Sequence, residues 1–279
     1  MILDEIVAHK RTEVAARKAM RPSAAVAAAA ERPRPARGFR QALSSPGLAV
    51  IAEIKGASPS TGTIRTSIDP VAVAGTYEAG GAAALSVLTD AKYFGGSWEA
   101  LAAVCRVCRL PALCKEFIID PYQVDEALAA GSAAVLLIAA ILDGAQLRRF
   151  LGDVRRRGMD ALVEVHTPDE VAVAVDAGAD LIGINNRDLQ TLRVDLETTV
   201  RLRPLIPPGI VVVSESGFAT RAQVEKVERA GVDAVLVGTS LMASADPAAK
   251  LRELRGVGNS TGVRGRFTTS PSPSGRGQG

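Results

Sequence analysis

Short apolar runs alternate with longer stretches of mixed polarity along most of the chain. Eight of the apolar runs have the length of β-strands: 48–54, 82–88, 112–117, 133–139, 161–165, 181–184, 210–214 and 234–237. The stretches between and after them predict helices near 70–79, 97–107, 120–130, 143–157, 168–177, 195–203, 220–230 and 246–254. Apolar strands that alternate with helices are typical of parallel strands buried on both faces.

Local signals mark both ends of these helices. Pairs such as Asp69-Pro70 and Thr167-Pro168 stand where helices are expected to start, and glycines such as Gly178 follow where they end. Eight consecutive strand–helix units favour a closed barrel. The alternative is an open doubly wound sheet, but no GxGxxG sequence follows the first strand. The predicted fold class is therefore α/β, a single (β/α)8 TIM barrel.

The barrel is predicted to span 48–254, after an N-terminal helical extension at 1–47 and before a disordered tail at 255–279. Within the extension, residues 2–19 predict an amphipathic helix and 38–44 a second, short one. The extension could plug the bottom of the barrel or cover the mouth of its active site. The spacing of its apolar residues is equally compatible with both.

Composition and charge narrow the function classes. The chain is 47% hydrophobic and only 4% aromatic, which suits α/β packing. The formal net charge is +3, but the tail holds four arginines and no acid, so the folded part is close to neutral. The tail is also rich in Gly, Ser and Pro, a composition that does not form a packed core. Nucleic-acid binding would need a basic stripe with stacking aromatics on a folded face, and none is evident.

We expect a cytoplasmic protein that does not enter a membrane. The first residues form a charged, amphipathic stretch without the apolar run of a signal peptide. The longest purely apolar run, 133–142, is ten residues long and too short to span a bilayer as a helix. Three cysteines, an odd number, suggest reduced thiols rather than a disulfide framework.

Charged residues of both signs stand at the carboxyl ends of several predicted strands: Glu53, Lys55, Lys115, Glu164 and Glu215. At that end of a barrel the βα loops form the active site. Charges embedded in strands are costly unless they pair. Their convergence on one rim therefore indicates a site in which acid and base groups tune each other's pKa values.

Glycine-containing turns follow the last two predicted strands. Ser216-Gly217 ends the seventh strand and Gly238-Thr239-Ser240 ends the eighth. In barrels, backbone N–H groups of these two loops and of a short extra helix often bind phosphate. We therefore predict a phosphate site here, with a short helix continuing after the second turn.

Five motifs resemble those of the indole-3-glycerol phosphate synthase family. They are IAEIKGASPS (51–60), SVLTDAKYFGGS (86–97), KEFIIDPYQ (115–123), GINNRDL (183–189) and VSESG (213–217). The motifs occur in order, and the likeness covers residues 1 to about 255. The chain is identified on these motifs as a member of that family.

The resemblance implies a lyase of tryptophan biosynthesis. Its substrate would be 1-(2-carboxyphenylamino)-1-deoxy-D-ribulose 5-phosphate, which loses CO2 and water to give indole-3-glycerol phosphate. The resemblance implies that Lys115 is the general acid of ring closure, and that Glu164 and Lys55 serve the acid/base steps. The remaining members of the implied catalytic set are Glu53, Asn185 and Glu215.

Binding roles are implied in the same way. The substrate-binding set is Ser58, Pro59, Phe94, Phe117, Leu136, Arg187, Leu189 and Ser216. The phosphate-binding set is Lys55, Gly217, Gly238, Thr239 and Ser240. Five apolar members of the substrate set resemble a wall beside the aryl carboxylate, which would aid decarboxylation. The reaction needs no metal and no cofactor. We expect a small phosphorylated substrate and a monomer or weak homodimer, which could associate with other tryptophan-pathway enzymes.

Three positions depart from the family pattern. Gly56 and Thr61 stand where basic residues are usual, which would weaken phosphate attraction or only alter surface charge. Glu116 stands where Asp is usual, which keeps the charge and lengthens the side chain. None of these departures removes a proposed catalytic group.

Other features have simpler interpretations. Cys105 and Cys108 form a CxxC in a predicted helix but lack a second ligand pair for a metal. His166 lies two residues after Glu164 and is expected on the same side of its strand, in a capping or packing role rather than a catalytic one. His9 is expected to be solvated.

Two alternative functions stay open on the sequence. One is another phosphate-binding barrel such as phosphoribosylanthranilate isomerase, although the Cys/Asp pair of that family is not recognised here. The other is a non-catalytic phosphate-binding barrel, which would not need both Lys115 and Glu164.

Overall fold

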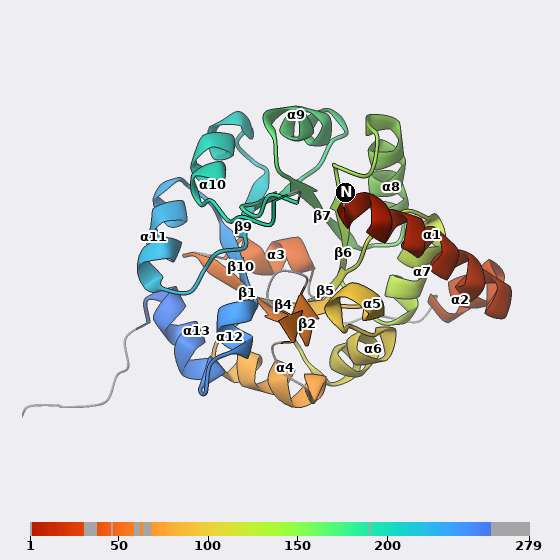
Figure 1. The fold of residues 1–279 in the computed structure, drawn as a ribbon, viewed down its shortest axis with the longest axis horizontal. Coiled ribbons are helices and arrows are strands. Elements are labelled where there is room, and N and C mark those ends of the chain that lie inside the picture. Colours follow the sequence, from red (N-terminus) through yellow and green to blue (C-terminus); the bar gives the residue numbers. More distant parts are fainter. Residues whose placement is uncertain are drawn as a thin grey trace, which may run out of the picture.

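The computed structural model describes residues 2–30, 38–45, 47–58, 62–63, 68–189 and 191–257. Eight parallel strands close into a barrel in the order β1-β10-β9-β8-β7-β6-β5-β4 (Figure 1). The strands are β1 (Ala49–Ile54), β4 (Ala84–Leu88), β5 (Ala112–Lys115), β6 (Ala134–Ile138), β7 (Asp160–Val165), β8 (Leu181–Asn185), β9 (Val211–Glu215) and β10 (Ala234–Val237). The predicted closed barrel is confirmed, and the open sheet is excluded.

Helices ring the barrel, as predicted. They are α4 (Pro70–Ala79), α6 (Trp98–Val107), α7 (Pro121–Ala129), α8 (Gly144–Arg156), α9 (Pro168–Asp176), α10 (Glu197–Leu202), α11 (Arg221–Arg229) and α13 (Pro247–Arg255). The expected caps form: the Asp69 carboxylate accepts from the Val71 and Ala72 N–H groups, and the Thr167 hydroxyl caps α9. Helix α13 includes Arg255, one residue beyond the predicted barrel boundary. Residues 258–279 of the predicted tail lie outside the described part.

Several short elements complete the barrel. They are α5 (Ala91–Phe94), the 3-10 turn η1 (Arg203–Leu205), α12 (Thr239–Met242) and the hairpin of β2 (Ala57–Ser58) and β3 (Gly62–Thr63). Helix α12 is the short helix predicted after the eighth strand. The hairpin was not predicted, because two residues per strand are too few to carry an alternating pattern.

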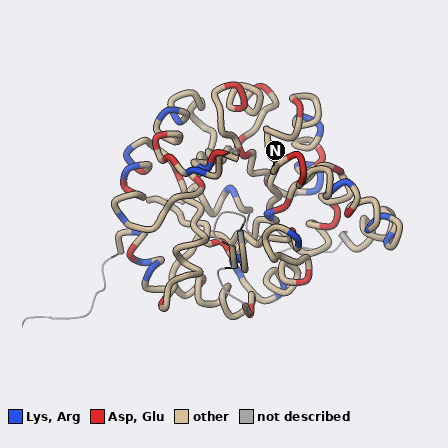
Figure 2. The backbone as a smooth tube through the Cα atoms, viewed as in Figure 1, with Lys and Arg blue, Asp and Glu red and all other residues tan. Residues whose placement is uncertain are grey.

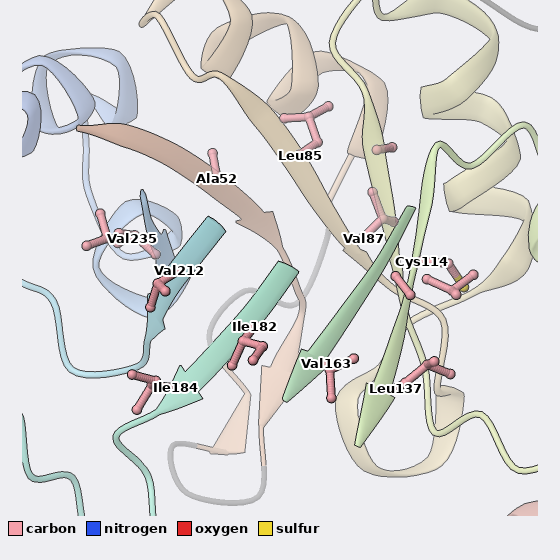
Figure 3. Close-up of a cluster of buried hydrophobic side chains, with 14 of the residues drawn as sticks. Ala52, Leu85, Val87, Cys114, Leu137, Val163, Ile182, Ile184, Val212 and Val235 are labelled. Carbon is pink, nitrogen blue, oxygen red and sulfur yellow. The ribbon is translucent and has the colours of Figure 1, made fainter. Parts of the chain in front are cut away.

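Alternation along each strand divides the barrel into an inner and an outer layer. In β7, Leu162 packs inside the barrel, whereas Val163 and Val165 belong to the layer between strands and helices. Figure 3 shows part of that outer layer, with Val163, Ile182 and Val212 on successive strands. Toward the carboxyl ends, the inward positions change from apolar to charged residues. The functional side chains therefore form the top inward-facing layer of the barrel.

The N-terminal extension does both of the things that the sequence left open. Helix α3 (Phe39–Leu43) plugs the bottom, where Phe39 and Leu43 are buried against the inner layer. Helix α1 (Ile2–Met20) lies at the opposite end, where Ile2 and Ile6 line the central cavity. Helix α2 (Ser23–Ala30), which was not predicted, packs with α1 on α7 through Val26.

A fully buried lysine fixes α1 to the barrel. The Lys10 Nζ atom lies 2.8 Å from Asp90 Oδ2 and 2.9 Å from Glu116 Oε1, and all three side chains are fully buried. Burial alone would lower the pKa of Lys10, but Glu116 and Asp90 outweigh it and hold the pKa above its usual range. On the same helix, His9 is half-buried and packs edge-on against Tyr93, so the expectation of a solvated His9 is wrong.

Charges of both signs are mixed over the helices around the barrel (Figure 2). Among the described residues, no helix combines the length and the apolar character that crossing a bilayer would require.

Candidate active site

One cavity of about 470 Å³ opens at the carboxyl ends of the barrel strands. Its size is within the range of small-molecule sites. The predicted residues that line it are Glu53, Lys55, Phe94, Lys115, Phe117, Leu136, Glu164, Asn185, Arg187, Leu189, Glu215, Ser216, Gly217, Gly238, Thr239 and Ser240. Of the other two, Ser58 lies in β2 but its side chain is not described, and Pro59 lies outside the described residues, as does Thr61.

Lys115 lies between two glutamates from distant strands. Its Nζ atom is 3.2 Å from Glu164 Oε2 and makes a second, closer contact with Glu215 Oε2. The Lys115 side chain is 13% exposed, and those of Glu164 and Glu215 are 4% and 1% exposed. The predicted lysine–glutamate pair therefore meets inside the barrel, at the mouth of the cavity.

Burial and charge set the protonation states of these three groups. Burial alone would lower the pKa of Lys115, but Glu215 and Glu164 outweigh it and raise the pKa. Burial alone would raise the pKa of Glu164, but Lys115 and the neighbouring His166 outweigh it and lower the pKa. Burial dominates for Glu215 and raises its pKa to about 7. Near neutral pH, Lys115 therefore stays protonated and Glu164 stays ionised, whereas Glu215 titrates in this range.

A second pair stands on the first strand. Lys55 Nζ lies 2.8 Å from Glu53 Oε1, and the Ser86 hydroxyl from the adjacent strand donates to Glu53 Oε2 at 3.4 Å. Burial favours the neutral form of Glu53, but Lys55 and Lys115 outweigh it and lower its pKa. With Glu215 protonated, the two ammonium groups balance the two carboxylates. An anionic substrate would then meet a site without excess negative charge.

Hydrogen bonds of Asn185 and Asn186, at and just after the end of β8, connect the acid/base groups to the neighbouring loops that line the cavity. Asn185 donates to Glu164, and its side-chain oxygen accepts from the Arg187 N–H at 3.0 Å. The neighbouring Asn186 is a supporting residue that the sequence did not single out. Its side-chain amide donates to the Ser214 hydroxyl at 3.0 Å and to the Glu215 carbonyl at 3.0 Å. These bonds join β8 to β9 directly behind the Glu215 side chain.

The predicted phosphate end has unusual backbone. Ser216 and Gly217 have positive φ angles of 70° and 95°, and a side chain at position 217 would collide with Val194. A side chain at Gly238 would collide with Glu53 and Lys55. Glycine is therefore required at both turns, and at 238 it lets the Lys55 ammonium come close to the backbone.

The opposite end of the cavity is apolar. The Phe94 and Phe117 rings lie 5.9 Å apart between centroids, and Leu136 and Leu189 line the same space. Helix α1 contributes further apolar residues that the sequence-based site omitted: Ile2, Leu3 and Ile6. Their place on the apolar side of the first helix was the available signal, but nothing in the sequence showed which surface that side meets.

Glu116 does not belong to the Lys115 cluster. Glu116 directly follows the last residue of β5, turns away from Lys115, and contacts Lys10 and the Thr89 hydroxyl, the latter at 2.9 Å. The longer side chain at this position thus serves the attachment of α1, although it also borders the cavity.

The cysteines lie elsewhere. Cys105 belongs to α6, Cys108 caps it, and Cys114 points into the outer layer of β5. None of the three lines the cavity, which argues against a Cys/Asp acid–base pair. Within the described residues, no group of three or more His, Cys, Asp or Glu side chains could hold a metal ion.

Two lysines and three glutamates around one cavity at the carboxyl end of the strands define a (β/α)8-barrel enzyme of the acid/base type. A family model described as Indole-3-glycerol phosphate synthase matches residues 3–254. The chain belongs to this family.

Curated relatives agree with that assignment, and a solved structure shares the fold. The chain is 46% identical over 258 residues to the indole-3-glycerol phosphate synthase of Dehalococcoides mccartyi (strain CBDB1), which covers 91% of this chain and 100% of the relative. It is 48% identical over 264 residues to that of Roseiflexus sp. (strain RS-1), covering 91% and 98%. A solved 3-hexulose-6-phosphate synthase has a TM-score of 0.59 at 16% identity, over 75% of this chain and 99% of that chain. That likeness supports the barrel fold alone.

Proposed function

We propose that the protein is an indole-3-glycerol phosphate synthase. It closes the indole ring of 1-(2-carboxyphenylamino)-1-deoxy-D-ribulose 5-phosphate with loss of CO2 and water. The observation that carries this proposal is the position of Lys115, which contacts Glu164 and Glu215 at the mouth of a cavity with one apolar end and one glycine-rich end.

Ring closure needs a proton donor. The aryl carbon that bears the carboxylate attacks the ketone carbon, and the ketone oxygen becomes a hydroxyl by taking a proton from Lys115. The high pKa of Lys115 keeps that proton in place until charge develops on the oxygen. The bond to the carboxylate carbon then breaks, CO2 leaves, and its electron pair restores the aromatic ring. The apolar wall formed by Phe94 and Phe117 favours this step, because a carboxylate is poorly stabilised there.

Dehydration needs an acid and a base together. The new hydroxyl leaves as water with a proton from an acid, while a base removes a proton from the new ring. Glu164 is held ionised and suits the base, and Lys55 beside Glu53 suits the acid. The turns at Gly217 and Gly238, next to the Lys55 ammonium, hold the phosphate at the other end.

The replacement Lys115→Met tests this proposal. We expect kcat to fall by about 10²- to 10⁴-fold, because the proton donor is gone, while the variant still binds substrate. Product fluorescence measures turnover, and calorimetric titration measures binding. Lys18→Met is the matched control, because Lys18 lies on the surface of α1. Near-normal turnover of Lys115→Met would overturn the assigned role, and a wild-type protein that makes no product would overturn the function.

A further inference from the structure

His166 lies directly behind the Glu164 carboxylate. Its Nε2 atom is 3.4 Å from Glu164 Oε1, on the oxygen that Lys115 does not contact. Its Nδ1 atom is 3.1 Å from Glu170 Oε2, and its backbone N–H donates to the same oxygen at 2.7 Å. The imidazole is thus fixed between one carboxylate at the site and one in the first turn of α9.

The charge of the ring follows from its neighbours. Both ring nitrogens face carboxylate oxygens, which accept hydrogen bonds and do not donate them. Nδ1 lies within hydrogen-bond distance of Glu170, whereas Nε2 has no hydrogen-bond partner among the described residues and meets Glu164 at ion-pair distance only; the imidazolium is the form that both carboxylates stabilise. Burial alone would lower the pKa of His166, but Glu170 and Glu164 outweigh it and raise the pKa above its usual value. Glu215 on β9 adds to the negative field, so the groups that face the ring are Glu164 from β7, Glu170 from α9 and Glu215.

We infer that His166 is a positioning residue for the proposed reaction. Its imidazolium lies at ion-pair distance from Oε1 of Glu164 while Lys115 contacts Oε2, so positive charge on both sides keeps the carboxylate ionised. Glu170 orients the ring and is the third member of this chain of groups. The inference rests on the proposed function for its catalytic consequence, but the state of the ring can be measured without turnover. The sequence favoured a capping or packing role for His166, and its contacts with Glu170 at the start of α9 fit that role; the inference adds a role toward Glu164.

The first experiment does not depend on activity. The chain contains two histidines, so ¹⁵N labelling of the rings gives two sets of signals, and His166→Gln identifies the relevant set. We expect His166 to carry protons on both nitrogens at pH 7. A neutral ring at pH 7 would overturn the inference, whatever reaction the enzyme catalyses.

The second experiment separates positioning from packing. In His166→Gln the positive charge beside Glu164 is lost, so the pKa of Glu164 rises and the acid limb of the kcat profile moves to higher pH. On that acid limb we expect kcat to fall about tenfold for each unit of the shift, with a much smaller loss at pH 8.5. KM should change little. At high pH the wild-type ring also loses its proton, so the two proteins converge.

Two further variants complete the test. Glu170→Gln removes the carboxylate that orients the ring and should shift the acid limb in the same direction by less. Asp169→Asn removes the same charge from the exposed neighbouring position in that turn and should leave the profile unchanged. A loss in His166→Gln that is equal at every pH, on the acid limb as well as above it, would show that the residue only packs. Should His166→Gln fail to fold, an unshifted acid limb in Glu170→Gln would overturn the inference instead.

Discussion

Two buried lysines meet the end of the same strand, and they differ in how their carboxylate partners are bound and how far the lysine itself is buried. Around Lys10, both oxygens of Glu116 are occupied: Oε1 by Lys10 and the Phe117 N–H, and Oε2 by the Thr89 hydroxyl. Around Lys115, Oε1 of Glu215 has no hydrogen-bond partner among the described residues. The Lys10 ammonium is fully buried, whereas Lys115 is 13% exposed and lines the cavity.

This difference separates the Lys10 cluster, which attaches α1 to the barrel, from the Lys115 cluster, which can react with a substrate. A fully buried ammonium that contacts three carboxylates, as Lys10 does, keeps one geometry and is not available to a ligand. A cluster with an unpartnered oxygen and a titrating carboxyl can accept or release protons when a substrate arrives. Because Lys115 ends β5 and Glu116 follows it directly, the two side chains point in opposite directions and each joins a different cluster.

The largest effect should come from removing each lysine in turn. Lys10→Met leaves Glu116 and Asp90 buried without a counter-charge, which should cost about 3–5 kcal/mol of unfolding free energy. Lys115→Met should lower kcat far more than it lowers stability, because its cluster opens to water. Urea unfolding and turnover of both variants, compared with Lys18→Met, give the result. An equal loss of unfolding free energy in Lys10→Met and Lys115→Met would contradict the distinction between the two clusters.

A smaller effect concerns pH. The folded-state pKa of Glu215 is raised to about 7, above its value in the unfolded chain. The folded protein therefore binds this proton more tightly, and the resulting stability is complete below about pH 4.5 and is lost as pH rises through about 7. In Glu215→Gln that loss disappears, so the unfolding free energies of variant and wild type should diverge by about 1–3 kcal/mol between pH 5 and 8. Parallel stability curves would contradict the raised pKa.

The smallest effect contrasts two glycines at opposite ends of the barrel. Gly217 at the cavity and Gly158 before β7 both have positive φ, 95° and 68°. Gly158→Ala should cost about 1 kcal/mol of stability through backbone strain, and Gly217→Ala should cost more, because its side chain would also collide with Val194. Only Gly217→Ala should also raise KM, because its turn borders the proposed phosphate position. Steady-state kinetics of the two variants measure this, and an equal KM in both would place the phosphate elsewhere.

Much of the fold and of the site could be predicted from local patterns. Apolar runs and caps predicted the eight strands and their helices, because parallel strands buried on both faces leave a strong signal. Alternation also predicted that Glu164 and His166 share a side, and the strand ends predicted which charges converge. The hairpin and helix α2 were missed because neither carries a periodic pattern.

The sequence by itself determined a closed barrel with acid/base groups on one rim, since both follow from periodicities within single segments. Only the tertiary structure decided which charge meets which: that Lys10 is buried against Glu116, that His166 reaches from Glu164 to Glu170, and that α1 covers the apolar end of the cavity. A lysine counts as polar in any helical pattern, and its partners here lie about 80 and 106 positions away in the chain. Such pairings depend on where the barrel brings its loops together, which no local pattern specifies.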